Sequence, residues 1–347
     1  MQKHKLTIYI LIALLLFTSC TYSLDYTLEE DTTKTQGDAQ FHFIDVGQGD
    51  CTLIRSGDTN IMIDAGTWES GSVICEYLSN LGIDYLDCFI GSHPHEDHLG
   101  GAAAVLSAMD VGAVYLNGET SASYFFERFA DTLLEEDITP LIPDIVFIYD
   151  VGPFKLEFLS PERDFGDTND NSLVLTVKYG DVKALFTGDA ERSVEAELIK
   201  NGRNISADIL KVGHHGSRYA SSAEFLNRVY PSVAVIQSGS GNSYGHPHDE
   251  AIERIEACGA EILRCDNLGT VVLSTDGKNI YKASGEAYEE KEEREEIEQI
   301  YIGNKKSKVF HCETCPNLPG DKNRIVFNKR ENAVLAGYSA CGNCFAK

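Results

Sequence analysis

The fold is decided by the stretch Ser92-His93-Pro94-His95-Glu96-Asp97-His98-Leu99-Gly100-Gly101, which places three imidazoles and the carboxylate of Asp97 within six residues. It directly follows an apolar run over residues 86–90, which predicts a buried strand. Imidazole nitrogens and carboxylate oxygens are the ligands of open catalytic zinc sites. On a tight loop, His93 and His95 can bind one ion while Asp97 and His98 bind a second. Because the chain has ten histidines in all, a chance cluster of three is a poor explanation.

Five further motifs accompany this loop: FIDVGQGD at 43–50, NIMIDAG at 60–66, FTGD at 186–189, KVGHHGS at 211–217 and YGHPH at 244–248. In this order, and with the HxHxDH pattern of residues 93–98, they resemble the metallo-β-lactamase superfamily. Within it, they resemble the hydrolase domain of ComEC-type DNA-uptake proteins and their free-standing secreted relatives. The resemblance covers residues 40–282 and implies two divalent ions in one hydrolytic site.

Strand and helix patterns alternate through residues 40–285, which we interpret as one hydrolase domain. Strands are predicted over 41–46, 51–55, 60–64, 86–90, 111–116, 145–149, 154–159, 173–179, 182–186, 208–212 and 232–237. Helices are predicted over 71–81, 102–109, 122–135, 191–201, 223–229 and 249–258. Two β-rich halves interleaved with helices favour an α/β fold, the four-layer αββα sandwich. In that fold, the motif loops meet at one edge of the stacked sheets.

Asp189 follows an apolar strand, where its carboxylate can bridge two ions; a turn aspartate has the same pattern. The resemblance places a ligand of the second ion at His246, in a Gly/Pro loop. Its neighbour His248 is either a substitute ligand or a surface residue. Asp64 ends a strand at Ala65-Gly66 and either orients the metal loop from behind the ligands or forms the turn. The resemblance favours the first role.

One histidine that many superfamily members have is missing, since residues 99–188 contain none. Thr168-Asn169-Asp170-Asn171-Ser172 stands in its place and resembles the asparagine-serine motif of ComEC-type domains. Asn169 or Asn171 would supply an oxygen ligand, or a hydrogen bond to a metal-bound water, in place of a nitrogen ligand. Oxygen ligands favour manganese over zinc, so both metals and the number of ions stay open.

His214-His215-Gly216-Ser217 follows another apolar strand. In related phosphodiesterases, a histidine near this point contacts the scissile phosphate or protonates the leaving oxygen, because an imidazole pKa lies near neutrality. We therefore predict His214 and His215 as catalytic residues beside Asp97, with metal ligation as the alternative for the two histidines. Ser217 either hydrogen-bonds a phosphate oxygen or caps the turn.

Residues 1–20 have the pattern of a secretory signal, with Lys3 and Lys5 before an apolar run over residues 6–17. This run is too short for a stable membrane span. Its ending, Phe17-Thr18-Ser19-Cys20, resembles a bacterial lipobox and predicts lipidation of Cys20, with ordinary secretion as the alternative because Phe17 replaces the usual leucine. Residues 21–39 predict a flexible tether. We expect an extracytoplasmic protein, anchored to the cell membrane by lipid or secreted.

An acidic stretch over residues 286–299 predicts a solvated linker. Residues 300–347 follow with His311, Cys312, Cys315, Cys341 and Cys344, at the spacing of a structural zinc site. A domain of fewer than fifty residues scarcely folds without a bound metal or a similar cross-link. The stretch resembles the small Ada-type metal-binding domain, in whose pattern His311 pairs with Cys315. Ligation by Cys312 in place of His311, and two disulfides, are the alternatives.

Five other cysteines lie in apolar surroundings and are expected as buried thiols, with a disulfide between Cys258 and Cys265 as the alternative. They are Cys51, Cys75, Cys88, Cys258 and Cys265.

The chain has a net charge of -25, with -22 in residues 40–285 and +5 in residues 300–347. An acidic body does not attract a polyanion non-specifically. If the substrate is anionic, the metals must supply the attraction, and the basic tail is the part that would contact an anionic polymer.

The leading hypothesis is a metal-dependent phosphodiesterase or nuclease that acts on DNA. Two ions would lower the pKa of the water between them, so that hydroxide attacks phosphorus. One alternative is hydrolysis of a cell-wall phosphoester, such as a teichoic-acid phosphocholine ester, or of a small ester. The other is a non-catalytic lipoprotein that binds wall polymer or DNA. The sequence has no channel-forming membrane segments, and it does not predict the oligomeric state.

Overall fold

The computed structural model describes residues 38–145, 147–282, 300–312, 315, 317–328 and 330–341. The predicted signal peptide with Cys20, the tether up to residue 37 and the acidic linker lie outside the described residues, as do Cys344 and the side chain of Cys312.

The first sheet has seven strands in the order β16-β15-β1-β2-β3-β5-β7. The strands are β1 (Ala39–Phe43), β2 (Thr52–Ser56), β3 (Thr59–Ile63), β5 (Cys88–Gly91), β7 (Val114–Leu116), β15 (Val271–Thr275) and β16 (Ile280–Lys282). Strands β2 and β3 form a hairpin, with Gly57 in the left-handed conformation at the turn. Strands β3, β5 and β7 are parallel, so their carboxyl ends lie at one edge.

The second sheet also has seven strands, in the order β14-β13-β12-β11-β10-β9-β8. They are β8 (Ile148–Val151), β9 (Phe154–Ser160), β10 (Val174–Tyr179), β11 (Val182–Phe186), β12 (Ile209–Lys211), β13 (Val233–Ile236) and β14 (Glu261–Arg264). Strands β11 to β14 are parallel. The mixture of a β-hairpin half and a parallel half therefore recurs in both sheets.

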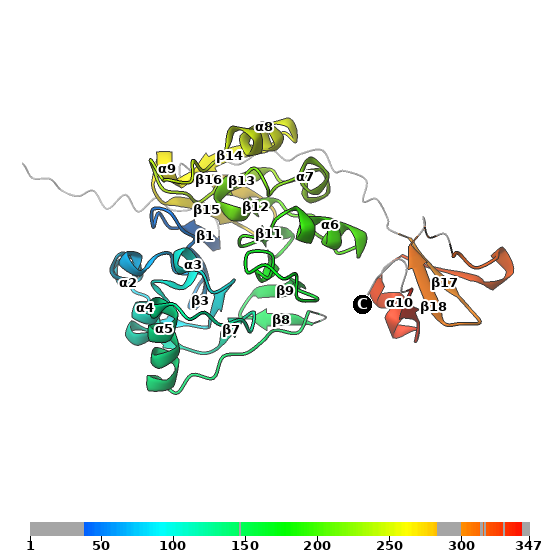
Figure 1. Cartoon of the computed structure of the whole chain (residues 1–347), viewed down its shortest axis with the longest axis horizontal. Coiled ribbons are helices and arrows are strands. Elements are labelled where there is room, and N and C mark those ends of the chain that lie inside the picture. The colour runs from blue at the N-terminus through cyan, green and yellow to red at the C-terminus, as the bar shows by residue number, and fades with distance from the viewer. Residues whose placement is uncertain are drawn as a thin grey trace, which may run out of the picture. The chain divides into compact units, whose positions relative to one another are not determined.

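Three apolar cores define four layers. One core lies between the sheets, with Phe41, Phe158 and Phe186 among its members. The second packs α2 (Gly71–Asn80), α4 (Ala102–Ala108) and α5 (Tyr124–Glu135) on the first sheet. The third packs α6 (Arg192–Lys200), α7 (Ala223–Val229) and α8 (Asp249–Ala257) on the second sheet. Figure 1 shows the two groups of helices on opposite sides of the strands. The predicted αββα sandwich is confirmed.

The structure differs from the predicted elements mainly at short segments. The strand predicted over 86–90 divides into β4 (Tyr85–Leu86) and β5. The strand predicted over 111–116 divides into β6 (Asp110–Val111) and β7. Both divide because β4 and β6 pair with each other in a separate two-stranded sheet. The strand predicted over 145–149 begins later, at Ile148. The single-turn helices η1 (Trp68–Ser70), α3 (Glu96–Leu99), η2 (Gly213–Gly216) and α9 (Cys265–Leu268) are too short to leave a periodic pattern.

Within the part of the chain that the structure describes, no helix combines the length and the apolarity that a membrane crossing requires. Cys51, Cys75, Cys88, Cys258 and Cys265 are thiols, so the alternative of a Cys258–Cys265 disulfide is wrong.

The C-terminal residues form a separate small sheet in the order β19-β17-β18-β20. Its elements are β17 (Tyr301–Asn304), β18 (Val309–Cys312), η3 (Asp321–Asn323), β19 (Arg324–Phe327), α10 (Arg330–Leu335) and β20 (Ser339–Ala340). Its core contains Tyr301, Phe310, Phe327, Ala333 and Tyr338 together with the thiols of Cys315 and Cys341.

Candidate metal centre

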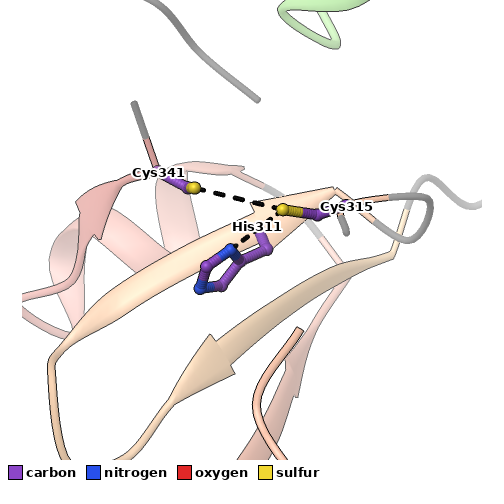
Figure 2. A group of neighbouring side chains, drawn as sticks. All are labelled: His311, Cys315 and Cys341. Atoms are coloured by element: carbon purple, nitrogen blue, oxygen red, sulfur yellow. Dashed lines mark hydrogen bonds between the residues drawn. The ribbon is translucent and has the colours of Figure 1, made fainter. Parts of the chain in front are cut away.

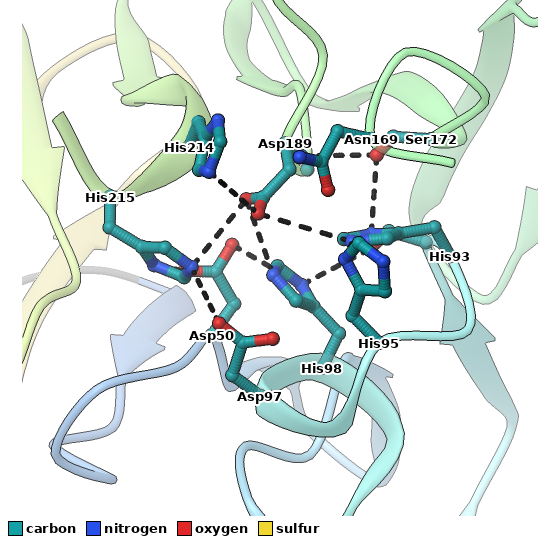
Figure 3. A network of polar contacts seen from close by, with 12 residues as sticks. Asp50, His93, His95, Asp97, His98, Asn169, Ser172, Asp189, His214 and His215 are labelled. Carbon is teal, nitrogen blue, oxygen red and sulfur yellow. Dashed lines mark hydrogen bonds and ion pairs between the residues drawn. The ribbon is translucent and has the colours of Figure 1, made fainter. Parts of the chain in front are cut away.

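The motif residues come together because they follow strands that end at the same edge of the sandwich. Asp64 follows β3, His93 follows β5, Asp189 follows β11 and His215 follows β12. Asp50 lies in the loop between β1 and β2. Figure 3 shows these loops from both sheets converging on one group of side chains.

Asp189 lies at the centre of this group and is buried. Its Oδ1 is 3.2 Å from His98 Nε2 and 3.6 Å from His215 Nε2. Its Oδ2 is 3.9 Å from His93 Nε2 and 3.7 Å from His214 Nε2. Each carboxylate oxygen therefore faces a different pair of imidazoles, which is the arrangement that a bridging ligand requires.

Two ligand sets share Asp189. Asp97, His98, Asp189 and His215 offer one atom each, all within 4.8 Å of one another, and therefore form a candidate metal group. On the other side, His93 Nε2 lies 3.0 Å from His95 Nδ1, next to Asp189 Oδ2. The structure thus divides the HxHxDH residues between two positions.

Three of the histidines are held at Nδ1 by partners outside the cluster, which leaves each Nε2 available as a ligand. The contacts are His98 Nδ1 to Asp64 Oδ2 at 2.8 Å, His215 Nδ1 to the Gln237 carbonyl at 2.9 Å, and His93 Nδ1 to Ser92 Oγ at 3.1 Å and Ser172 Oγ at 3.2 Å. Hydrogen bonds of this kind fix the ring orientation before any ion binds.

Asp64 is fixed in turn by the metal loop. Its φ of +56° is uncommon for a residue with a side chain. Its buried carboxylate accepts hydrogen bonds from the Ser92 N–H at 2.7 Å and the Ser92 hydroxyl at 2.8 Å. Asp64 therefore lies behind His98, away from the atoms that surround Asp189.

The buried charges of the cluster do not balance without a cation. Burial lowers the pKa of His98, but the carboxylates of Asp189 and Asp64 outweigh it and raise this pKa well above its usual value. At His215, Asp189 and Asp50 outweigh burial in the same way and raise the pKa to about 10. Without an ion, these carboxylates thus favour protons on His98 and His215, whereas burial lowers the pKa of His93. A divalent ion would take the place of the two protons.

Unpartnered atoms support the fit of a metal. At this site, six buried polar atoms make no hydrogen bond of acceptable geometry among the described residues, although ion pairs bring His98 Nε2 and His215 Nε2 to 3.2 and 3.6 Å from Asp189 Oδ1. The six are Asp50 Oδ1, His98 Nε2, Asn169 Oδ1, Asp189 Oδ1, His215 Nε2 and His246 Nδ1. An unpartnered buried donor or acceptor destabilises a protein by about 1–3 kcal/mol. Their concentration beside Asp189, in a set of imidazole, carboxylate and amide donors, matches what zinc or manganese binds.

His214 and His215 point in different directions although they are adjacent, because both have left-handed backbone angles, with φ of 47° and 53°. His215 is buried among the ligands. His214 is partly exposed, and its Nδ1 lies 2.9 Å from Glu191 Oε1. His214 therefore faces the cluster from its open side. The Ser217 hydroxyl accepts a hydrogen bond from the Tyr219 N–H at 3.3 Å, the turn-capping contact.

His246 lies beside the candidate metal group. Its ring centroid is 5.4 Å from that of His214 and 6.1 Å from that of His215. The candidate metal group contains His215, for which the sequence predicts catalysis or metal ligation, and it does not include His246, which the resemblance predicts as a ligand. Burial and the neighbouring imidazoles lower the pKa of His246 to about 4. His248 Nδ1 accepts a hydrogen bond from the Arg218 N–H at 3.1 Å and does not join the cluster.

Asn169 and Asn171, the two asparagines that follow Thr168, lie in different surroundings. Figure 3 shows the side chain of Asn169 beside Asp189, and its buried Oδ1 is one of the unpartnered atoms. The Asn171 side chain instead donates to Glu119 at 2.6 Å and to Asp164 at 2.9 Å, and accepts from the Phe165 N–H at 2.8 Å. Asn171 therefore holds its loop, and the structure does not bring it to the cluster.

Sequence reasoning missed Asp50 and Lys211 as site residues. Lys211 is 2% exposed and makes an ion pair with buried Asp50, whose Oδ1 lies 3.2 Å from His215 Nδ1. A buried lysine at the end of a strand is unusual. The signal was present, since both residues stand inside quoted motifs, but nothing in the sequence indicates that they pair.

The C-terminal sheet carries a candidate metal group of its own, His311, Cys315 and Cys341, all buried. Figure 2 shows the three side chains pointing toward one another, with His311 Nδ1 3.3 Å from Cys315 Sγ and the two sulfurs 4.0 Å apart. Both cysteines are thiols, so a disulfide between them is not formed. Two sulfurs and an imidazole are ligands that zinc prefers. Cys312 and Cys344, which the sequence predicts as further ligands, fall where the side chains are not described.

Comparison with known proteins gives a family match and several relatives. The profile of the "Metallo-beta-lactamase superfamily" matches residues 44–239. ComE operon protein 3 of Bacillus subtilis is 29% identical over 253 residues, 67% of this chain and 33% of the relative. Competence protein ComA of Neisseria gonorrhoeae is 34% identical over 230 residues, 65% of this chain and 31% of the relative. Recombination protein 2 of Haemophilus influenzae is 32% identical over 222 residues, 62% of this chain and 26% of the relative. The chain spans about a third of the length of these relatives.

Among solved structures, the metallo-beta-lactamase fold protein YhfI of Bacillus subtilis aligns over 68% of this chain and 98% of its own, with 15% identity and a TM-score of 0.49. The superfamily profile covers more than half of the chain and includes most strands of the two sheets and the cluster around Asp189. The chain therefore belongs to the metallo-beta-lactamase superfamily, with the ComEC-type competence proteins as its relatives.

Proposed function

We propose that this chain is a metal-dependent phosphodiesterase that cleaves DNA outside the cytoplasm. The observation that carries the proposal is the buried cluster around Asp189, with its excess of carboxylates and its unpartnered ligand atoms. Members of the superfamily are typically metal-dependent hydrolases. The similar proteins are named for competence and recombination, and these names support DNA as the substrate.

Two ions would be held by the two sets that share Asp189. His93, His95 and the Asn169 oxygen face one position, and Asp97, His98 and His215 face the other. When bound, zinc or manganese would lower the pKa of a water molecule and stabilise the negative charge that develops on a phosphate. The oxygen of Asn169, where many superfamily members have an imidazole, favours manganese at the first position.

His214 is the residue best placed to move a proton. It is partly exposed at the open side of the cluster, and its Nε2 lies 3.7 Å from Asp189 Oδ2. Glu191 holds Nδ1 at 2.9 Å, which orients the ring. A proton on Nε2 would pass to the leaving oxygen of a phosphodiester, while Gln237 and Asp64 keep the ligand imidazoles oriented.

The C-terminal sheet would bind one structural zinc through His311, Cys315 and Cys341, with Cys344 or Cys312 completing the site, as in an Ada-like domain. Its charge of +5 makes it the part of the chain suited to contact an anionic polymer. Lipid on Cys20 would hold the protein at the outer face of the cell membrane. A Cys20→Ala variant would then leave the membrane fraction, and retention there would contradict the anchor.

A second candidate is hydrolysis of a cell-wall phosphoester or a small ester. The charge of -22 over residues 40–285 favours it, because an acidic surface repels a long polyanion.

Turnover by the purified mature chain tests the proposal. Single-stranded DNA, duplex DNA and bis-p-nitrophenyl phosphate would be offered with added Mn²⁺ or Zn²⁺. We expect cleavage of DNA that is lost in Asp189→Asn and kept in Asp150→Asn, an exposed aspartate on β8. Turnover of the small diester alone would support the second candidate. Metal binding without any turnover would indicate a non-catalytic binding protein.

A further inference from the structure

An exposed aromatic ring is stacked beside the metal cluster. Tyr244 lies in the loop between β13 and α8 and is 65% exposed. Its ring stacks on that of His246, with centroids 5.7 Å apart and an angle of 21° between the planes. The His246 ring is in turn 5.4 Å from the ring of His214, which faces Asp189. One face of Tyr244 is thus turned toward the cluster through His246, and most of the ring is in solvent.

The loop that carries Tyr244 is built to hold this position. Asn242 Oδ1 accepts hydrogen bonds from the Tyr244 N–H at 3.1 Å and the His246 N–H at 3.0 Å. Asn242 Nδ2 donates to the Gly239 carbonyl at 2.9 Å and to the His246 carbonyl at 2.5 Å. The Gly239 N–H donates to Gln48 Oε1 at 3.1 Å, which fastens the loop to the one between β1 and β2. Because the ring is already positioned, little ordering entropy is lost when a ligand stacks on it.

Charge near the cluster is a poor means of holding DNA. Arg218 pairs with Glu250 at 3.1 Å. Arg254 and Arg192 donate to main-chain carbonyls of the loop that follows His215. These guanidinium groups are therefore occupied, and the domain is acidic overall. Stacking on an aromatic ring does not depend on net charge and accepts any base, since every base has a π-face.

We infer that Tyr244, backed by His246, is a base-binding site, on which a nucleobase of single-stranded DNA stacks while a neighbouring phosphate reaches the cluster. The inference rests on the proposed DNA phosphodiesterase activity and adds a preference for single strands. Bases in a duplex are already stacked on each other and cannot cover this ring without being turned out of the helix.

Steady-state cleavage of a single-stranded oligonucleotide by the full mature chain tests the site. We expect Tyr244→Ala to lower kcat/KM by about 5- to 100-fold, mainly through KM, which is the range reported for loss of one base stack. Tyr244→Phe keeps the ring and should stay within about twofold of the wild type. The matched control is Tyr85→Ala, an exposed tyrosine on β4, at the other end of the strands, which should leave cleavage unchanged.

Binding provides a readout that does not depend on turnover. In an Asp189→Asn background, the affinity for a fluorescent oligothymidylate should fall on adding Tyr244→Ala and should be kept with Tyr244→Phe. Replacing single bases by abasic positions identifies the stacked base. At that position, the abasic substrate should weaken cleavage by the wild type and should cause no further loss in Tyr244→Ala.

The outcomes separate the two proposals. If the wild type cleaves no DNA, the proposed function fails and the base site fails with it. If the wild type cleaves DNA and Tyr244→Ala matches it, or if the effects of the abasic position and of Tyr244→Ala simply multiply, the base site alone is overturned. An equal loss on duplex and single-stranded DNA would overturn the strand preference.

Discussion

The cluster around Asp189 and the His311, Cys315 and Cys341 group of the C-terminal sheet lie in opposite kinds of surroundings. Around Asp189, the ligands stand at the edge of a sandwich whose three apolar cores contain none of them. In the C-terminal sheet, Cys315 and Cys341 are themselves members of the small core, and His311 is buried with them. The first cluster is attached to a scaffold that is already packed, whereas the second is part of the packing.

This difference separates two uses of a metal. A large apolar core stabilises the sandwich whether or not an ion is bound, so the Asp189 cluster can keep its ligands in an arrangement chosen for chemistry. A domain of fewer than about 50 residues buries too little apolar surface to fold unaided. There, the free energy of metal binding becomes free energy of folding.

Metal removal should give the largest effect and the sharpest contrast. We expect a strong chelator to unfold the C-terminal sheet, since structural zinc sites contribute roughly 10 kcal/mol, and to leave the sandwich folded. The chain has one tryptophan, Trp68 on η1, so its fluorescence reports on the sandwich alone. NMR signals of residues 301–341 report on the small sheet. If the small sheet stays folded without metal, its folding does not depend on metal binding and the proposed difference between the two parts is wrong.

Replacing one ligand at the sandwich edge should remove turnover without unfolding either part. His98→Gln deletes the imidazole that lies between Asp64 and Asp189. We expect a loss of about 10³-fold or more in kcat/KM, which corresponds to about 4 kcal/mol. His42→Gln is the matched control, because His42 is also buried in the first sheet but contacts Tyr77 and Gln40 instead of the cluster. If His98→Gln keeps its turnover, the cluster around Asp189 is not the catalytic site.

The Asp50–Lys211 pair should have an intermediate effect. Loss of groups that orient metal ligands typically weakens metal binding by about 10- to 100-fold. We expect this for Asp50→Asn, measured by competition with a chromogenic chelator, with zinc binding at His311 and Cys315 unchanged. Because a buried charge without its partner is destabilising, Asp50→Asn with Lys211→Met should be more stable than Asp50→Asn alone. Equal thermal stability of the two variants would contradict the buried pair.

A further prediction concerns the stability of the sandwich in acid, away from either metal group. Burial, with a contribution from Arg55, lowers the pKa of His42 to about 4 from its ordinary value of 6.5. The unfolded chain therefore binds a proton near pH 6.5, and the folded chain does so only near pH 4. Stability should fall as pH drops through this window, by up to about 3 kcal/mol. Chemical denaturation at several pH values, followed by Trp68 fluorescence, should show that the free energy of unfolding declines less steeply toward low pH in His42→Gln than in the wild type. If both proteins show the same decline, His42 does not cause the loss of stability in acid.

The sequence determined the ligand chemistry and the scaffold. The HxHxDH loop, the apolar strands before Asp189 and His214, and the periodic helices follow from local composition, and local pattern is enough to place a residue at the end of a strand. The same reasoning located His311, Cys315 and Cys341 as one group.

Only the tertiary structure decided which side chains meet. Left-handed backbone angles send His215 into the cluster and His214 to its open side. His215 thereby joins the candidate metal group, the alternative that the sequence left open for it, while the role of His246 as a ligand stays a prediction. Asn169 reaches Asp189 while Asn171 holds its own loop. Asp50 and Lys211 pair across the two sheets. A motif specifies the residue types, but loop conformation and the contact of distant strands specify which atoms come within a few ångströms, and no local pattern carries that information.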